Sequence, residues 1–219
     1  MDLSEFKTHV CLVSHEAAAN FLPAVAEGIR PENIVLIETD KMHRQAKDLT
    51  NAFERAIPGV KVSSLVLTDS WDIEKITEEI CQFFSNNKFP TPILNATGGH
   101  KLMMLGAYRA FFVLNYPVFY FRIDHDDIQL ITPDDKQVKI NIIKCEPNLE
   151  HYLLAYGYRI LSTKEKVEAP FDYSRKELCQ TLIRNYSVYS DGVRAINFMA
   201  TTTKANPSLT YSLDKGTNK

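Results

Sequence analysis

The residues best suited to chemistry are Thr97, Gly98, Gly99, His100 and Lys101, which join a short apolar run to a long helical pattern. The first turn of a helix presents unpaired backbone N–H groups and a partial positive charge. Two glycines let an anion approach that backbone closely, while Thr97 adds a hydroxyl donor and Lys101 a full charge. This spacing predicts a phosphate-binding turn.

The turn matches neither common phosphate loop, because the chain has no GxxxxGK[ST] motif and no GxGxxG motif near its first strand. A purely structural role, in which the glycines start a helix and allow close strand–helix packing, therefore stays open. His100 adds a titratable group beside the turn. It is either a hydrogen-bond donor to a ligand or a residue for acid–base chemistry near neutral pH.

Other groups of polar residues favour simpler explanations. The segment 122–127 (RIDHDD) has metal-ligand residue types, but it lies between two expected strands, where a tight turn is favoured. Residues 14–16 (Ser-His-Glu) are adjacent, and adjacent residues seldom converge as a triad. His9, His43 and His151 stand alone and are expected to be surface residues or satisfied ones. We expect neither a metal nor a cofactor.

Composition narrows the class of protein. A formal net charge of −2 argues against a general nucleic-acid binder. The N-terminus lacks the layout of a signal peptide, and Arg109, Asn115 and Pro117 interrupt the longest apolar stretch. The four cysteines are widely spaced without a CxxC pair, so a disulfide scaffold or structural zinc is not expected. These features predict a reduced, cytoplasmic protein.

Strand and helix patterns alternate four times, and three strand patterns without helices between them follow. The expected strands are 9–14, 33–39, 60–67 and 92–96, and the expected helices are 16–29, 40–56, 72–86 (after caps at Asp69 or Ser70) and 100–114. This alternation predicts a parallel sheet covered on both faces. Three closely spaced strands follow, at 118–123, 128–133 and 138–143. The fold class is therefore α/β, a Rossmann-like parallel sheet with an antiparallel edge meander.

The expected helix 100–114 has almost no polar face. Such a helix is expected to be buried on all sides, by its own sheet and by a second subunit. Burial in the core of one chain is the alternative.

In the C-terminal quarter the regular alternation of strand and helix patterns ends. We expect a domain over 1–158, a polar linker over 159–171, and a small, incomplete winged-helix-like segment over 172–219. A nuclease of the PD-(D/E)xK kind needs a strand pair bearing Asp and then Glu-x-Lys, and the chain offers no such context.

Three stretches together resemble the CARF domain (CRISPR-associated Rossmann fold). They are LVSHEAAANFLPAV after the first strand, ETDKMHRQA after the second and LNATGGHKLMMLGAYRAFF after the fourth. The resemblance covers residues 8–155 and, more faintly, AINFMATT beyond. The subfamily most similar joins CARF to a restriction-endonuclease-like domain in CRISPR ancillary nucleases.

The resemblance implies a homodimer that binds cyclic oligoadenylate, the messenger of type III CRISPR defence, across its two-fold axis. A symmetric ring of repeating units suits such a dimer. His100 departs from the family pattern, which usually has a small polar residue there. The ligand-binding residues it implies are Ser14, His15, Lys41, Met42, Asn95, Thr97, Gly98, Gly99, His100 and Lys101.

Three functions are compatible with these observations. The first is a sensor domain for cyclic oligoadenylate, most simply cyclic tetra-adenylate, whose effector nuclease is absent from this chain. The second is a metal-independent ring nuclease, in which the ribose 2′-OH attacks the phosphate and His100 and Lys101 assist. The third is a CARF-type transcription regulator, if residues 172–219 complete a winged helix. The sensor is favoured, with no membrane and no direct nucleic-acid partner expected.

Overall fold

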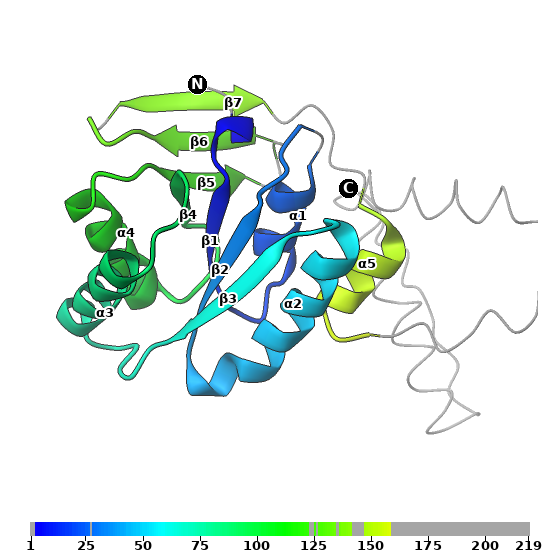
Figure 1. Ribbon diagram of the computed structural model, residues 1–219, viewed down its shortest axis with the longest axis horizontal. Helices are drawn as coiled ribbons and strands as arrows, with labels where there is room; N and C mark the ends of the chain where they lie inside the picture. The colour runs from blue at the N-terminus through cyan, green and yellow to red at the C-terminus, as the bar shows by residue number, and fades with distance from the viewer. Residues whose placement is uncertain are drawn as a thin grey trace, which may run out of the picture. The chain divides into compact units, whose positions relative to one another are not determined.

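A seven-stranded mixed sheet organises the chain around its first strand, in the order β3-β2-β1-β4-β5-β6-β7 (Figure 1). The structure, a computed structural model, describes residues 3–26, 28–122, 125, 127–134, 136–141 and 147–158. Strands β1 to β5 are parallel, and β6 and β7 run antiparallel to their neighbours. The strands are β1 (Thr8–Leu12), β2 (Asn33–Glu38), β3 (Lys61–Val66), β4 (Pro92–Asn95), β5 (Val118–Arg122), β6 (Asp127–Ile131) and β7 (Gln137–Asn141).

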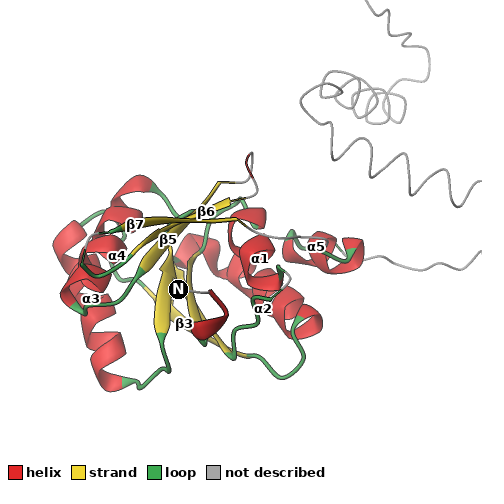
Figure 2. Cartoon of the chain, turned by 90° about the horizontal axis from the view of Figure 1, so that it is seen from above, coloured by secondary structure: helices red, strands yellow, loops and turns green. Residues whose placement is uncertain are grey.

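Helices cover both faces of the sheet. Two of them, α3 and α4, lie on one face, and α1, α2 and α5 lie on the other (Figure 2). These elements are α1 (Ala18–Val25), α2 (His43–Ala56), α3 (Ile73–Asn86), α4 (Lys101–Val113) and α5 (Leu149–Ala155), with short 3-10 turns η1 (Leu3–Glu5) and η2 (Asp40–Met42). The predicted Rossmann-like α/β fold with an antiparallel edge is confirmed.

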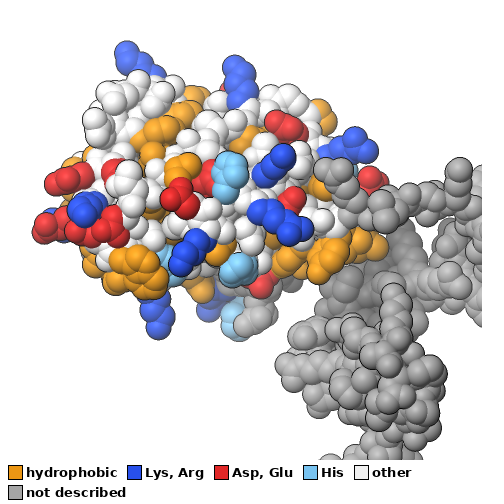
Figure 3. Space-filling view, turned by 90° about the horizontal axis from the view of Figure 1, so that it is seen from below, with side chains coloured by type: hydrophobic (Ala, Val, Ile, Leu, Met, Phe, Trp, Pro, Cys, Tyr) orange, Lys and Arg blue, Asp and Glu red, His pale blue; other side chains and the backbone are white. Residues whose placement is uncertain are grey.

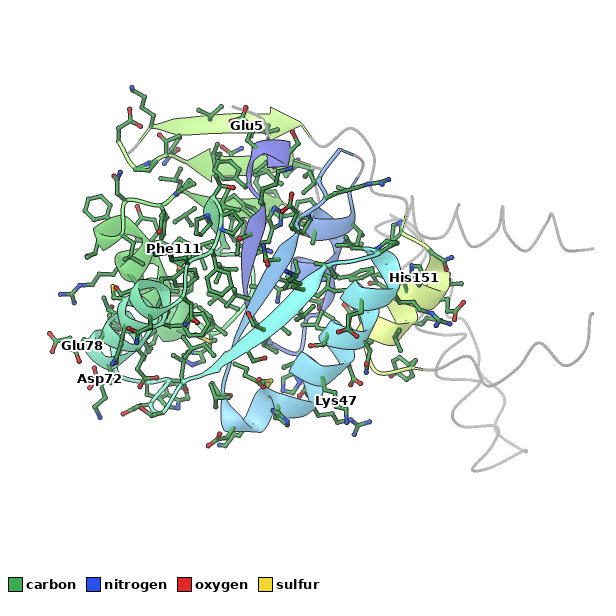
Figure 4. The ribbon with its side chains drawn as sticks, in the orientation of Figure 1. Glu5, Lys47, Asp72, Glu78, Phe111 and His151 are labelled. Atoms are coloured by element: carbon green, nitrogen blue, oxygen red, sulfur yellow. The ribbon has the colours of Figure 1, made fainter. Side chains whose placement is uncertain are left out.

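Alternation along β1 divides the core into two layers. Val10 and Leu12 pack in the layer under α3 and α4, whereas Cys11 packs in the layer under α1 and α2. A strand covered on both faces must be apolar at successive positions, and β1 is buried throughout. Phe111 fills the first layer between α4 and the sheet (Figure 4).

The strand order contains one topological switch point. From β1 the chain moves outward to β2 and β3, and then crosses to the other side of β1 to form β4. The loops after β1 and β4 therefore leave neighbouring strands toward opposite faces of the sheet. In open α/β sheets, ligands bind at this place, beyond the carboxyl ends of the strands.

The ends of some helices differ from their prediction. The helical pattern over 40–56 begins as the 3-10 turn η2 before α2 follows. The cap of α3 is Asp72, not Asp69 or Ser70, because the Asp72 carboxylate accepts a hydrogen bond from the Glu74 N–H at 2.9 Å. Asp69 instead accepts from the Trp71 N–H and shapes the preceding loop.

Helix α5 was not predicted. It packs beside α2, and its side chains Tyr152, Leu154 and Ala155 join the core layer on that face. Its only local signal is the cap at Asn148, whose side chain accepts from the Glu150 N–H at 2.8 Å.

The outer face of α4 is exposed within this chain, which contradicts the alternative that this helix is buried in the core of one chain. Its burial by a second subunit stays a prediction. Within this chain Leu105 is 46% exposed, Phe112 59% and Val113 65%. Met103, Ala107 and Phe111 lie on the opposite side of the helix and are buried. A helix without a polar face leaves apolar surface in water when only one side is packed.

His9 is neither a surface residue nor a satisfied one, contrary to the prediction. It lies in the central strand β1, and its ring meets the ring of Phe119 edge-on at 5.8 Å. Its Nε2 has no hydrogen-bond partner among the described residues. Burial lowers the pKa of His9 to about 4, so the ring is neutral at physiological pH.

The acidic segment 122–127 has a structural role in the part that the structure describes. Asp127 lies in β6 and is buried, and its carboxylate accepts from Arg122 Nε at 2.6 Å and from Lys139 Nζ at 3.0 Å. The Arg122 hydrogen bond holds the pKa of Asp127 well below its usual range. Among the described residues no group of three or more His, Cys, Asp or Glu side chains could hold a metal.

The described residues all belong to one compact unit, residues 1–161. The linker predicted over 159–171 and the winged-helix-like segment predicted over 172–219 lie outside the described residues. No helix in the described part of the chain is both long and apolar enough to span a bilayer.

Candidate functional site

The glycine turn after β4 packs directly against the end of β1. A Cβ atom on Gly98 would lie 2.3 Å from the backbone oxygen of Leu12. Gly99 has a φ of +75°, and a Cβ there would lie 2.9 Å from the Leu12 Cβ. Gly98 is thus required by close backbone approach at the switch point, and Gly99 by its positive φ and its contact with the Leu12 side chain, as the structural alternative predicts.

Two buried asparagines hold this turn from beneath. Asn95 Nδ2 donates to the Ala19 carbonyl at 2.9 Å, and Asn95 Oδ1 accepts from the Thr97 N–H at 3.0 Å. Asn20 Nδ2 donates to the Leu12 carbonyl at 2.8 Å. Asn95, predicted to contact a ligand, is only 1% exposed and therefore positions the turn from inside the protein. Asn20, in α1, was missed because its role depends on contacts with the ends of β1 and β4.

Thr97 connects the turn to the next strand. Its hydroxyl oxygen accepts a hydrogen bond from the Phe121 N–H in β5 at 2.8 Å. A hydroxyl that accepts from a backbone amide keeps its own proton for a further acceptor. The predicted donor role of Thr97 toward an anion is compatible with this contact.

The N-terminus of α4 leaves two amides open. The Met103 N–H donates to His100 Nδ1 at 3.4 Å, and the Met104 N–H donates to the His100 carbonyl at 2.9 Å. The amides of Lys101 and Leu102 have no hydrogen-bond partner within the described residues. The exposed Lys101 side chain begins at the same turn. This end of the helix therefore has the donors and the charge of an anion site.

His100 uses Nδ1 as a hydrogen-bond acceptor, so the donor or acid–base role predicted from the sequence would fall to Nε2. The contact with the Met103 N–H requires its Nδ1 to be unprotonated. Its Nε2 is shielded from solvent and has no partner within the described part of the chain. Its ring stacks on the indole of Trp71, with centroids 4.7 Å apart and ring planes 20° apart.

Trp71 was missed as a site residue. It lies in the loop between β3 and α3, which also follows the carboxyl end of a parallel strand. The signal in the sequence is that the only tryptophan of the chain stands in a polar loop, Thr-Asp-Ser-Trp-Asp.

The remaining predicted residues lie in the loops after β1 and β2. Ser14 and His15 follow β1, and Lys41 and Met42 form part of η2 after β2. A hydrogen bond of 3.3 Å between His15 Nδ1 and Gln45 Nε2 joins the first loop to the start of α2. No hydrogen bond or ion pair joins Lys41 or Met42 to the glycine turn within the described residues.

All these loops share one edge of the sheet, since they follow parallel strands. This edge faces the bottom of Figure 1 and is seen directly in Figure 3, where histidine and basic side chains lie near the centre with acidic ones among them. Glu38, at the end of β2, is buried and its carboxylate pairs with His43 Nδ1 at 3.3 Å. Acidic and basic side chains are mixed on this edge. Attraction of an anion therefore depends on the local positive charge at the N-terminus of α4 more than on the net charge of the edge.

The parallel sheet has one switch point, and the open N-terminus of α4 lies there, so this chain is a Rossmann-like α/β protein with a candidate site for an anionic ligand. The family model of the Card1 CARF domain matches residues 8–152. The chain therefore belongs to the Card1 CARF domain family. None of the curated proteins matches the sequence.

Solved structures share the fold. Can2 from Sulfobacillus thermosulfidooxidans, in complex with cyclic tetra-adenylate, is 20% identical with a TM-score of 0.60, over 96% of this chain and 54% of that protein. Protein VC1899 from Vibrio cholerae is 16% identical with a TM-score of 0.63, over 94% of this chain and 53% of that protein. A type III CRISPR defence DNA nuclease activated by cyclic oligoadenylate is 20% identical with a TM-score of 0.58, over 94% of this chain and 31% of that protein. This chain thus spans about half of the first two proteins and less of the third.

Proposed function

We propose that this CARF domain binds a cyclic oligoadenylate, with cyclic tetra-adenylate as the preferred ring. It acts as the sensor part of a type III CRISPR ancillary effector, of the kind that joins CARF to a restriction-endonuclease-like domain. The observation that carries the proposal is the open N-terminus of α4, with Lys101, at the switch point of a Card1-type CARF fold.

The chemistry of this turn fits a phosphodiester. The unpartnered amides of Lys101 and Leu102 point out of the first helical turn, where the helix dipole favours negative charge. The Lys101 ammonium adds a charge-assisted hydrogen bond, and the Thr97 hydroxyl can donate a further one. Ser14 and His15, on the loop after β1, form the rim of the same edge in this proposal.

The outer face of α4 supports a homodimer. Positions 101, 105 and 112 lie on one side of a helix, and Leu105 and Phe112 are exposed there. Pairing of this face with its copy removes apolar surface from water and brings the two Lys101 side chains to the same two-fold axis. A ring of identical nucleotides can then use the same turn twice.

The contacts of His100 favour binding without cleavage. Its Nδ1 already accepts the Met103 amide, and its Nε2 is shielded from solvent. A general acid or base needs a nitrogen within hydrogen-bond reach of the proton that it moves. We therefore propose the sensor in preference to the ring nuclease. The transcription-regulator alternative depends on residues 172–219, which lie outside the described residues.

Isothermal titration calorimetry with the 219-residue chain tests this function directly. The ligands are cyclic tri-, tetra- and hexa-adenylate, with linear tetra-adenylate for comparison. Lys101→Ala should weaken the binding of cyclic tetra-adenylate at least about a hundredfold, because a dimer loses a charged hydrogen bond twice. Lys88→Ala is the matched control, since Lys88 is an exposed lysine before β4, at the opposite edge of the sheet.

Two results would contradict the proposal. One is the absence of binding to all three rings by the wild-type chain. The other is an unchanged affinity of Lys101→Ala for cyclic tetra-adenylate. Chromatography of the same mixtures after several hours reports cleavage, and a linear product would favour the ring nuclease.

A further inference from the structure

The loop between β3 and α3 displays the only tryptophan of the chain beside the candidate site. Trp71 is 71% exposed, although indole is one of the largest apolar side chains. One contact that it makes is the stack on His100, the residue that caps α4 next to Lys101. An indole has two faces, and with one of them on the imidazole the other is available to a ligand.

The backbone around Trp71 is held in place by hydrogen bonds. The Trp71 N–H donates to Asp69 Oδ1 at 3.0 Å, and Asp69 Oδ2 pairs with Lys75 Nζ of α3 at 3.3 Å. The amide hydrogen bond from Trp71, together with Lys75, lowers the pKa of Asp69. The Thr68 N–H donates to the Glu79 carboxylate at 3.1 Å. The loop before Trp71 is thus attached to α3, and α3 itself begins just after Trp71 with its cap at Asp72, so the backbone that carries the indole is held in place.

His100 connects this indole to the anion site. Its Nδ1 caps the first turn of α4, and its ring stacks on Trp71. A single residue therefore sets the position of the open amides relative to the exposed aromatic face. A ligand that carries an anion next to a flat ring can use both at once, and a nucleotide is such a ligand.

We propose that Trp71 is the platform on which an adenine base of the ligand stacks, while the phosphate of the same ligand binds at the N-terminus of α4. This inference rests on the proposed function and adds to it a residue that recognises the base. Preorganised aromatic platforms gain affinity because little conformational freedom is lost on binding. Purines offer a larger stacking surface than pyrimidines, so Trp71 also contributes to the preference for adenine.

The single tryptophan makes the test direct, because fluorescence excited at the long-wavelength edge, where the ten tyrosines do not absorb, reports on Trp71 alone. Titration of the wild-type chain with cyclic tetra-adenylate should change the emission and saturate at the affinity that calorimetry measures. Trp71→Ala should weaken binding about tenfold or more, as base–aromatic stacks do on alanine substitution, whereas Trp71→Phe should retain most of the affinity. Tyr158→Ala, which removes another exposed aromatic ring, should bind as wild type.

A second ligand separates stacking from a structural effect. The wild-type chain should prefer cyclic tetra-adenylate to cyclic tetra-uridylate, and Trp71→Ala should lose much of that preference. A variant that is merely less stable would weaken both rings equally, which would overturn the inference. Circular dichroism of each variant checks that the fold is retained.

The failures of the two proposals are distinguishable. If calorimetry shows wild-type binding while the emission stays unchanged and Trp71→Ala binds equally well, the stacking role is wrong and the proposed function stands. If calorimetry shows no binding, the proposed function itself is wrong. If Trp71→Ala becomes monomeric by light scattering while wild type is dimeric, the indole belongs to the contact between subunits and the stacking role is overturned.

Discussion

The hydroxyl of Tyr156, the residue that caps the end of α5, donates a hydrogen bond to the carboxylate of Glu16, in the loop after β1. The same hydroxyl accepts from the Ala18 N–H at 3.3 Å, at the start of α1. Burial and the hydrogen bond to Glu16 raise the pKa of Tyr156 well above its usual range, so the hydroxyl keeps its proton. The last described helix is thereby attached to the loop that carries Ser14 and His15.

Removing this hydroxyl should lower the stability of the domain. Tyr156→Phe loses a hydrogen bond to a carboxylate, and we expect the free energy of unfolding to fall by about 1 kcal/mol, since Glu16 is exposed to solvent. Urea denaturation measures the change as a lower midpoint with the same slope. Tyr158→Phe is the control, because its ring is exposed. Equal midpoints for the two variants would contradict the structural role of this contact.

Gly98 should tolerate no side chain. A methyl group there would meet the Leu12 carbonyl oxygen at 2.3 Å, so Gly98→Ala must displace backbone and should cost about 3 kcal/mol or more. Gly59→Ala places its methyl group in open space. It should lower the free energy of unfolding by only about 1 kcal/mol, because alanine is strained at the positive φ of +83°. Thermal unfolding of the two variants provides the comparison. A Gly98→Ala variant as stable as Gly59→Ala would mean that the turn can move away from β1.

His9 should make the domain sensitive to acid. Its pKa of about 4 in the folded state lies below the value of about 6.5 expected for an unfolded chain. Between these two pH values the unfolded state binds more protons, so stability is full above pH 6.5 and falls as the pH drops toward 4. The expected loss from this one ring is about 2 kcal/mol at pH 5 relative to neutral pH.

His9→Leu tests this by removing the buried titratable ring. Its unfolding free energy should depend less on pH than that of wild type between pH 7.5 and 5, by the amount assigned to His9. His125→Asn removes an exposed histidine and should follow the wild-type curve. If His9→Leu and wild type lose stability in parallel, the ring is not kept neutral by burial.

Substitution on the outer face of α4 should separate the subunits of the proposed dimer. Phe112 is 59% exposed in the single chain, and Phe112→Glu would place a charge in an apolar contact with its copy. Multi-angle light scattering at micromolar concentration should give twice the chain mass for wild type and the chain mass for this variant. Val138→Glu changes an exposed apolar residue of β7 and should remain dimeric. A wild-type monomer, with and without cyclic tetra-adenylate, would exclude a site shared between subunits.

The alternation of elements was predictable because strands and helices of a covered parallel sheet have strong, distinct periodicities. Helix α5 was not, since seven residues are too few to form a stable helix alone, and its position depends on packing against α2. The glycines predicted the turn at residues 97–99. The contact that requires them could not be predicted, because Leu12 lies in a strand more than 80 residues earlier in the sequence.

The spacing of residues in the sequence could not predict the polar contacts of the site. Asn20 lies in α1, Asn95 ends β4 and Trp71 lies in the loop after β3, and each has a partner that is distant in the sequence. His100 shows the same limit. Its position beside the turn was predicted, but its use as an acceptor for the Met103 amide is a matter of side-chain rotation, which no residue pattern encodes.

The pairing of β1 with β4 also determines when the site comes into existence during folding. Thr8 Oγ1 bonds the Pro90 carbonyl across 82 residues, so β4 reaches β1 only by closing a long loop, whereas β1 and β2 are close along the chain. A nascent chain that has formed β1, β2 and β3 already has a partial sheet, but it has neither the glycine turn nor the α4 terminus. A ligand held there stabilises the finished fold without stabilising its precursors. Ligand-dependent protection from proteolysis should therefore appear abruptly with chain length, once the synthesised chain extends through α4.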